Sequence, residues 1–165
     1  MLKIKDMRTA IFPGSFDPFT LGHQDVLESA LKIFDKVIIA VGYNANKATC
    51  GFFPVDTRIK IVEDAIKPYG KKVSVCSYKD LTINLCKRLN VKFIVRGLRN
   101  TTDFELEGVI AQANKILDPD VVTVYVQASH ECSFISSTVV RDVLIHRGDP
   151  TPFLPASVNI KKYLK

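Results

Sequence analysis

Residues 10–23, with the sequence AIFPGSFDPFTLGH, decide how this chain folds. The stretch begins as a short apolar strand, breaks at Pro13 and Gly14, and reaches Gly22 and His23 just before an amphipathic run, 25–34, that predicts a helix. A strand that continues through a glycine-containing turn into a helix presents backbone N–H groups and the positive end of the helix dipole, which suits a phosphate. We therefore expect His23 to face a bound phosphate; a purely structural role in the turn is the alternative.

The rest of the chain alternates between apolar strands and amphipathic helices. Further strands are predicted at 37–42, 73–76, 92–95 and 121–126, and further helices at 54–67, 83–89, 103–117, after residue 138, and at 156–164. This alternation predicts an α/β fold: a Rossmann-like, doubly wound domain with a five-stranded parallel sheet and right-handed crossovers. The strand at 121–126 alternates partly between apolar and polar residues, which places it near an edge of the sheet.

Length and composition favour one domain that spans residues 1–165. The chain has 165 residues, 47% of them hydrophobic, and residues 1–7 are interpreted as an N-terminal extension. Because these first residues mix charges with apolar side chains and no apolar run could span a bilayer, we expect neither a signal peptide nor a membrane segment, and a cytoplasmic location. The cysteines form no C-x-x-C pair, which predicts reduced thiols and no metal bound by the protein itself.

The charge of the chain indicates an anionic partner. The formal net charge is +6, but Lys and Arg are spread along the sequence. A small polyphosphate explains isolated basic residues near glycine turns at least as well as a nucleic acid does. A nucleotide-sensing or RNA-binding module is the alternative outside enzymes; an RNA binder requires clustered basic and exposed aromatic residues, and such clustering is not evident. We therefore expect no nucleic-acid partner.

Polar and basic side chains follow four of the five predicted strands. They are Ser15 and His23 after the first, Lys47 after the second, Arg96 and Arg99 after the fourth, and Ser136, Ser137 and Thr138 after the fifth. Because the carboxyl ends of parallel strands meet at one edge of the sheet, we expect these side chains to converge there. The alternatives are that the arginines pair with surface carboxylates and that the hydroxyl groups only cap a helix.

This predicted set contains no evident covalent nucleophile, which favours direct transfer between phosphates. An acceptor phosphate is already an oxyanion, so the protein has only to align the reactants and neutralise charge. We expect His23 to stabilise the α-phosphate of ATP, and Lys47 and Arg96 to hold the attacking phosphate. Arg99 and the turn 136–138 would hold the β- and γ-phosphates. Mg²⁺ is expected to arrive with ATP, bound mainly through the nucleotide phosphates.

Several motifs resemble, in order and spacing, the bacterial phosphopantetheine adenylyltransferases. Thr20-Leu21-Gly22-His23 is similar to the (T/H)-x-G-H motif of the nucleotidyltransferase superfamily, and the more specific segments are Pro13 to Pro18, Arg96-Gly97-Leu98-Arg99, Asp103-Phe104-Glu105, Glu107 and Ser133 to Ser137. The resemblance implies transfer of AMP from ATP to 4′-phosphopantetheine, giving dephospho-coenzyme A and pyrophosphate in coenzyme A biosynthesis. It also implies a homohexamer and coenzyme A as a competing feedback inhibitor.

The resemblance also implies which residues contact each substrate. Contacts with phosphopantetheine are implied for Ser15, Lys47, Thr82 and Arg96. Contacts with ATP are implied for Ser15, Phe16, His23, Gly97, Leu98, Arg99, Glu107, Cys132, Ser133, Phe134, Ile135, Ser136, Ser137 and Thr138. His23, Lys47 and Arg96 are the expected catalytic residues.

This sequence departs from the family pattern at a few positions. Ser15 replaces a frequent threonine, Cys132 replaces a common tryptophan, and Thr82 stands where an apolar residue is usual, which affects the expected contacts with adenine and with the acceptor. A nicotinamide-mononucleotide adenylyltransferase or a cytidylyltransferase would share the Gly-His motif and a Ser-Ser-Thr-x-x-Arg ending like the one completed by Arg141. The pattern from Arg96 to Glu107 argues against both.

Overall fold

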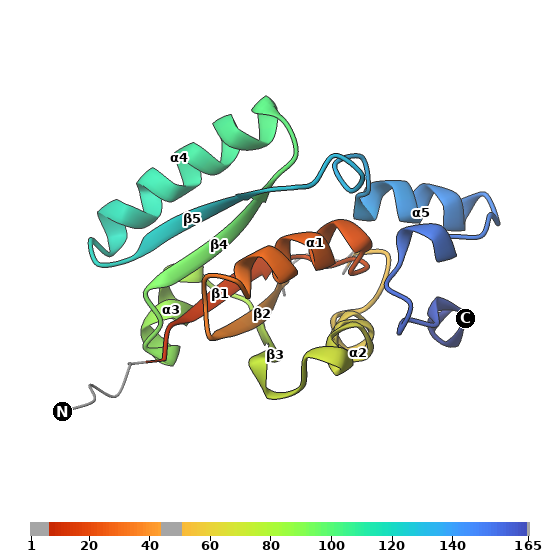
Figure 1. The fold of residues 1–165 in the computed structure, drawn as a ribbon, viewed down its shortest axis with the longest axis horizontal. Helices are drawn as coiled ribbons and strands as arrows, with labels where there is room; N and C mark the ends of the chain where they lie inside the picture. Colours follow the sequence, from red (N-terminus) through yellow and green to blue (C-terminus); the bar gives the residue numbers. More distant parts are fainter. Residues whose placement is uncertain (1–6, 44–50, 165) are drawn as a thin grey trace.

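Five parallel strands form one sheet in the computed structural model, which describes residues 7–43 and 51–164 (Figure 1). The order across the sheet is β3-β2-β1-β4-β5, and the strands are β1 (Thr9–Gly14), β2 (Lys36–Gly42), β3 (Val73–Tyr78), β4 (Phe93–Leu98) and β5 (Val122–Gln127). The chain moves outward from β1 to β3, returns to the other side of β1, and continues to β5. The predicted doubly wound parallel sheet is therefore confirmed, and β1 and β4 enclose its topological switch point.

Within the described residues, five α-helices connect and flank the strands. They are α1 (Leu21–Ala30), α2 (Val55–Ile66), α3 (Thr82–Leu89), α4 (Thr101–Leu117) and α5 (Ser137–Ile145), with 3₁₀ helices η1 (Lys67–Lys72), η2 (Thr151–Phe153) and η3 (Ile160–Tyr163). In Figure 1, α4 runs along β4 and β5, whereas α5 and the C-terminal segment lie beyond the opposite end of the sheet from the N-terminus. No helix among the described residues is both long and apolar enough to cross a membrane.

The core has one cluster on each face of the sheet, because successive strand side chains point to opposite faces. Phe12 packs in one cluster with Leu27 of α1 and Ile61 of α2, and its neighbour Ile11 packs in the other cluster with Ile83 of α3. All five of these apolar side chains are buried. The central strand is thus covered on both sides, which explains why its sequence is apolar throughout rather than alternating.

The predicted boundaries of two elements in particular differ from the structure, one because of a helix cap and the other because of strand pairing. Helix α1 begins at Leu21 and ends at Ala30, earlier than the predicted 25–34, because Thr20 and His23 form a capping box that starts the helix. Strand β4 continues to Leu98, beyond the predicted end at residue 95, because its pairing with β5 extends to the Leu98–Gln127 pair.

The predicted C-terminal helix at 156–164 is wrong. Only Ile160–Tyr163 is helical, as a single 3₁₀ turn. Tertiary contacts hold this segment on α2: the Tyr163 hydroxyl donates to Asp64 Oδ2 at 2.7 Å, and the Ser157 hydroxyl donates to the Ala65 carbonyl at 3.5 Å. These side-chain contacts with α2 hold the segment in a mostly non-helical conformation.

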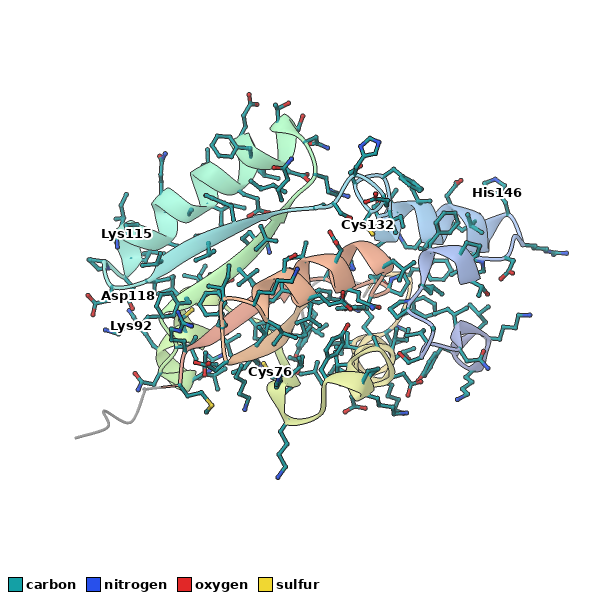
Figure 2. All side chains as sticks on the ribbon, viewed as in Figure 1. Cys76, Lys92, Lys115, Asp118, Cys132 and His146 are labelled. Carbon is teal, nitrogen blue, oxygen red and sulfur yellow. The ribbon has the colours of Figure 1, made fainter. Side chains whose placement is uncertain are left out.

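The cysteines within the described part of the chain are free thiols. They are Cys76, Cys86 and Cys132. Cys76 on β3 and Cys132 in the turn before α5 lie well apart (Figure 2). Burial raises the pKa of the Cys86 thiol to about 11, which keeps it protonated and unreactive at neutral pH.

Candidate active site

A cavity of about 300 Å³ opens at the carboxyl ends of β1 and β4. Its wall combines the turn after β1, the start of α1, the end of β4, the first turns of α4 and the start of α5. The residues that line it are Phe12, Pro13, Gly14, Ser15, Phe16, Gly22, His23, Val26, Arg96, Gly97, Arg99, Asp103, Glu107, Ala128, Ile135, Ser136, Ser137, Thr138 and Arg141. Segments separated by more than a hundred residues thus meet at the predicted edge of the sheet.

A second cavity, of about 310 Å³, adjoins the first. Both are lined by Pro13, Gly14, Ser15, Arg96 and Glu107. The second also contains Thr82 together with Gly42, Tyr78, Ile94, Ile110, Ala111, Asn114 and Thr123. Two cavities that share one basic wall can hold two ligands whose reacting groups meet beside Arg96.

Close packing at Gly22 brings the start of α1 against the turn that precedes α5. A Cβ atom at Gly22 would lie 2.6 Å from the carbonyl oxygen of Ile135, which is nearer than real Cβ atoms lie to other heavy atoms. Glycine is therefore required at this position, and the adjacent His23 is held at the N-terminus of the helix, beside residues 135–138.

The imidazole of His23 is neutral and its orientation is defined. Its Nδ1 atom accepts the backbone N–H of Thr20 at 3.0 Å, so the ring proton is on Nε2 and is available as a donor. Aromatic rings surround it, with the ring centroid of Phe16 at 5.0 Å and that of Phe19 at 5.3 Å. Burial, with the nearby charges of Arg99 and Arg96, lowers the pKa of His23 to about 3.

Two arginines from the end of β4 are each paired with a carboxylate from α4. Arg96 Nε donates to Glu107 Oε2 at 2.6 Å, and the same guanidinium also donates to Glu107 Oε1 and to the carbonyl of Pro13. Arg99 Nε donates to Asp103 Oδ2 at 2.9 Å, and this bond lowers the pKa of Asp103. The two carboxylates hold the guanidiniums in place, so both arginines are ion-paired and also line the cavity.

The hydroxyl groups at the start of α5 have both structural and cavity-facing roles. Ser136 Oγ accepts the N–H of Val139 at 3.2 Å and caps the helix, which is the structural role considered above. Ser137 Oγ donates to the carbonyl of Pro18 at 2.8 Å, so α5 is joined to the turn after β1. Together with Thr138, these residues line the first cavity beside the helix N-terminus, where a phosphate is favoured.

Some predicted site residues lie elsewhere. Lys47 falls outside the described residues. Leu98, Cys132, Ser133 and Phe134 line neither cavity, and their contact with ATP stays a prediction. Other basic side chains are remote from the site: Lys92 and Lys115 lie with Asp118 at the end of the sheet away from α5 (Figure 2).

Asp17 and Arg58 also build the site, although the sequence alone did not identify them. The buried carboxylate of Asp17 accepts the N–H groups of Phe52 at 2.7 Å and Phe53 at 2.8 Å. The buried Arg58 donates to the carbonyl of Ser15 at 2.8 Å. The only local signals were a charged residue before a proline and a charged residue on an amphipathic helix, and both are far more often solvated.

Known proteins resemble this chain in sequence over nearly its whole length. Residues 11–143 match the family described as Cytidylyltransferase-like. A phosphopantetheine adenylyltransferase of Flavobacterium johnsoniae is 46% identical over 156 residues, which cover 94% of this chain and 100% of the relative. One of Cytophaga hutchinsonii is 45% identical over 151 residues, covering 92% of this chain and 99% of the relative.

Solved structures share the fold at lower identity. A bifunctional NMN adenylyltransferase/ADP ribose pyrophosphatase from Francisella tularensis superposes with a TM-score of 0.71 at 17% identity, over 94% of this chain and 46% of the other. A protein from Vibrio parahaemolyticus, described as a nicotinate-nucleotide adenylyltransferase, superposes with a TM-score of 0.69 at 20% identity, over 92% and 88% of the two chains. With its fold, its two joined cavities and these relatives, the chain belongs to the cytidylyltransferase-like nucleotidyltransferases and, among them, to the phosphopantetheine adenylyltransferase family.

Proposed function

We propose that this protein transfers AMP from ATP to 4′-phosphopantetheine, giving dephospho-coenzyme A and pyrophosphate in coenzyme A biosynthesis. The observation that carries the proposal is the pair of cavities that meet at Ser15, Arg96 and Glu107. Direct transfer needs two anionic reactants in contact, and the shared wall is where their phosphates would meet.

The reaction we propose is an in-line displacement at the α-phosphorus of ATP. A phosphate oxygen of the acceptor forms the new P–O bond, while the bond between the α-phosphorus and the bridging oxygen breaks and pyrophosphate leaves. The Nε2–H of His23 would donate to an α-phosphate oxygen as charge develops there. A neutral donor with a fixed tautomer suits this role, because it needs no proton transfer.

The remaining contacts follow the division between the cavities. Arg99 with the turn 136–138 would hold the β- and γ-phosphates, because these residues line only the first cavity. Arg96, Ser15 and Thr82 would hold phosphopantetheine, since all three line the second. Lys47 keeps its predicted role in neutralising the attacking phosphate.

Mg²⁺ would enter with ATP rather than bind to a site built from protein carboxylates. Asp103 and Glu107 line the first cavity, and each is paired with an arginine. Among residues 7–43 and 51–164, no group of three His, Cys, Asp or Glu side chains is placed to hold a metal ion. This donor set fits an ion coordinated mainly by phosphates and water, and such an ion would withdraw charge from the nucleotide phosphates.

Assembly into a homohexamer and feedback by coenzyme A belong to the same proposal. The apolar surface of α4 supports assembly: Val109 is 67% exposed and Ile116 is 83% exposed, and apolar areas of this kind are typical of protein interfaces.

Coenzyme A contains the pantetheine arm, so it would compete for the second cavity. We expect the enzyme to act in the cytoplasm.

Pyrophosphate release from ATP, with one acceptor offered at a time, tests the proposed function. Phosphopantetheine should support turnover, whereas nicotinamide mononucleotide and glycerol 3-phosphate should not. Turnover with either of these two acceptors and none with phosphopantetheine would overturn the assignment. Arg96→Met should abolish the reaction with phosphopantetheine, and it serves as a control against contaminating enzymes.

A further inference from the structure

We propose that Arg58 is a positioning residue of the nucleotide site: its guanidinium holds the Ser15–Phe16 peptide so that the Phe16 N–H faces the first cavity. The inference rests on the proposed function for the identity of the ligand, a nucleotide phosphate. It depends on the structure alone for the geometry.

Arg58 extends from α2 to the end of β2, the strand that flanks β1 on the side away from β4. Its Nη1 atom donates to the carbonyl of Ser15 at 2.8 Å and to the carbonyl of Gly42 at 3.3 Å. Gly42 ends β2, so the guanidinium bridges the ends of two neighbouring strands. The side chain is only 3% exposed and does not line either cavity.

Peptide geometry transmits this contact to the cavity. The Ser15–Phe16 peptide bond is trans, so its carbonyl oxygen and its N–H point in opposite directions. The carbonyl points towards Arg58 on the β2 side of β1. The Phe16 N–H therefore points towards the β4 side, where Phe16 lines the first cavity together with Arg96 and Gly97.

The backbone of Phe16 needs such a restraint. Its φ angle is +46°, in the left-handed region that non-glycine residues seldom adopt and that persists only where the surroundings hold it. The Phe16 ring is 1% exposed and packs against Phe12, Phe19 and His23, which fixes the side chain. Arg58 fixes the other part of the turn, the peptide that precedes Phe16.

A flip of this peptide would reverse its effect on the ligand. With Arg58 in place, the cavity receives an N–H donor, which favours a phosphate. With the peptide reversed, the cavity would receive a carbonyl oxygen, which repels a phosphate. Ser15 lines both cavities, but Phe16 lines only the first, so the loss of the Phe16 N–H should affect the nucleotide more than the acceptor.

Calorimetric titration of the full-length protein with ATP and, separately, with phosphopantetheine tests this role. Arg58→Met should raise the Kd for ATP about tenfold, and Arg58→Lys, which keeps a cationic donor, should restore most of the affinity. The Kd for phosphopantetheine should stay within about threefold of wild type in both variants. The control variant Tyr163→Phe removes the hydrogen bond from the Tyr163 hydroxyl to Asp64, which lies on α2 as Arg58 does. This variant should lower stability without changing either Kd.

Two results would overturn the proposal: a Kd for ATP in Arg58→Met within about twofold of wild type, or an equal weakening of both ligands. Because Arg58→Met can fail to fold, the wild-type protein provides a second test. Its ¹⁵N-labelled Phe16 amide should shift downfield when pyrophosphate is added, and an unmoved signal contradicts the orientation that we propose. Turnover of the wild type with phosphopantetheine is measured on the same preparation, so a wrong acceptor would be recognised separately from a wrong role for Arg58.

Discussion

At the scale of single residues, the environment of His23 determines what this side chain can do. The Thr20 N–H occupies Nδ1, and the low pKa keeps the ring neutral, so His23 is a hydrogen-bond donor through Nε2 rather than a cation or a base. Arg96 and Arg99 supply the positive charge instead. In the mechanism that we propose, two charged guanidiniums would bind the phosphates and one neutral, oriented donor would stabilise the transition state.

Replacement of His23 should therefore impair turnover more than binding. His23→Ala removes one preorganised donor, and we expect kcat to fall by about a hundredfold or more while the Kd for ATP changes little. His23→Gln restores an N–H donor near the position of Nε2 and should recover part of the rate. Steady-state kinetics with calorimetric ATP binding measures both effects. An unchanged kcat in His23→Ala would remove His23 from the mechanism.

The low pKa of His23 should also make stability depend on pH. The pKa is about 3 in the folded protein and 6.5 for an ordinary histidine, so between these values the unfolded chain binds a proton that the folded chain does not. Stability from this residue is complete above pH 6.5 and decreases as the pH falls towards 3. Between pH 7 and pH 4.5, the Tm of the wild type should fall more than that of His23→Gln. Parallel Tm curves would show that burial of His23 does not oppose its protonation.

The sequence predicted which residues would contact phosphates. It did not predict the residues, such as Arg58 and Asp17, that hold the surrounding backbone in place. His23, Arg96 and Arg99 follow strands whose ends must meet, so topology alone brings them near one another. Arg58 and Asp17 act through backbone groups of a turn, and such partners depend on how α2 and the turn pack. The positive φ of Phe16 was equally hidden, because the usual signal for that conformation is a glycine.

At the scale of secondary-structure elements, the contact between β4 and α1 positions the arginines relative to His23. A Cβ atom at Gly97 would lie 2.7 Å from Cγ2 of Val26, so β4 and α1 are as close as glycine allows. Both residues also line the first cavity. This close approach sets the separation between the strand that carries Arg96 and the helix that carries His23.

Gly97→Ala should consequently damage both stability and activity. We expect a loss of about 1–3 kcal/mol from overpacking, together with a lower kcat, because α1 must move away from β4. Val26→Ala removes the methyl group that the new Cβ would meet. The double variant should therefore be less impaired than the sum of the two single variants, as measured by denaturant unfolding and turnover. Strict additivity would show that the two residues do not share one space.

Observed element boundaries differ from the predicted ones where tertiary contacts outweigh the local sequence preference. Residues 96–98 contain arginine and glycine, which favour a loop, yet the parallel ladder with β5 keeps them in β4. The C-terminal segment shows the reverse, since its helical pattern is overridden by contacts with Asp64 and Ala65. Propensity is a weak preference that a few tertiary hydrogen bonds can outweigh.

At the scale of the whole molecule, α4 connects the active site to the surface. Of its residues, all of which the structure describes, only Glu107 is buried, and this residue holds Arg96. The outward-facing apolar side chains include Leu106, Val109 and Ile116. A helix that is apolar on its outward face supports the proposed assembly, in which other chains would cover it.

Charges placed on this surface should weaken assembly. The double variant Val109→Glu/Ile116→Glu should sediment as a smaller species than the wild type, because burying two carboxylates in an apolar interface is costly. Ile33→Glu, at a residue that is 43% exposed and lies after α1, is the matched control and should keep the wild-type mass. If the wild type itself is a monomer by analytical ultracentrifugation, the proposed hexamer is wrong.

Sequence patterns were enough to predict the class of fold, the order of its elements and the chemical character of the site. Those properties follow from hydrophobic periodicity and turn residues, which are visible in short stretches of sequence, and from the general rule that parallel strands end at one edge of the sheet. The tertiary structure decided how that site is held: which carbonyls Arg58 and Arg96 bind, why Phe16 is left-handed, and how closely β4 approaches α1 at Gly97. These features depend on packing between segments far apart in the chain. A local sequence pattern cannot predict such contacts, because both partners come together only in the folded structure.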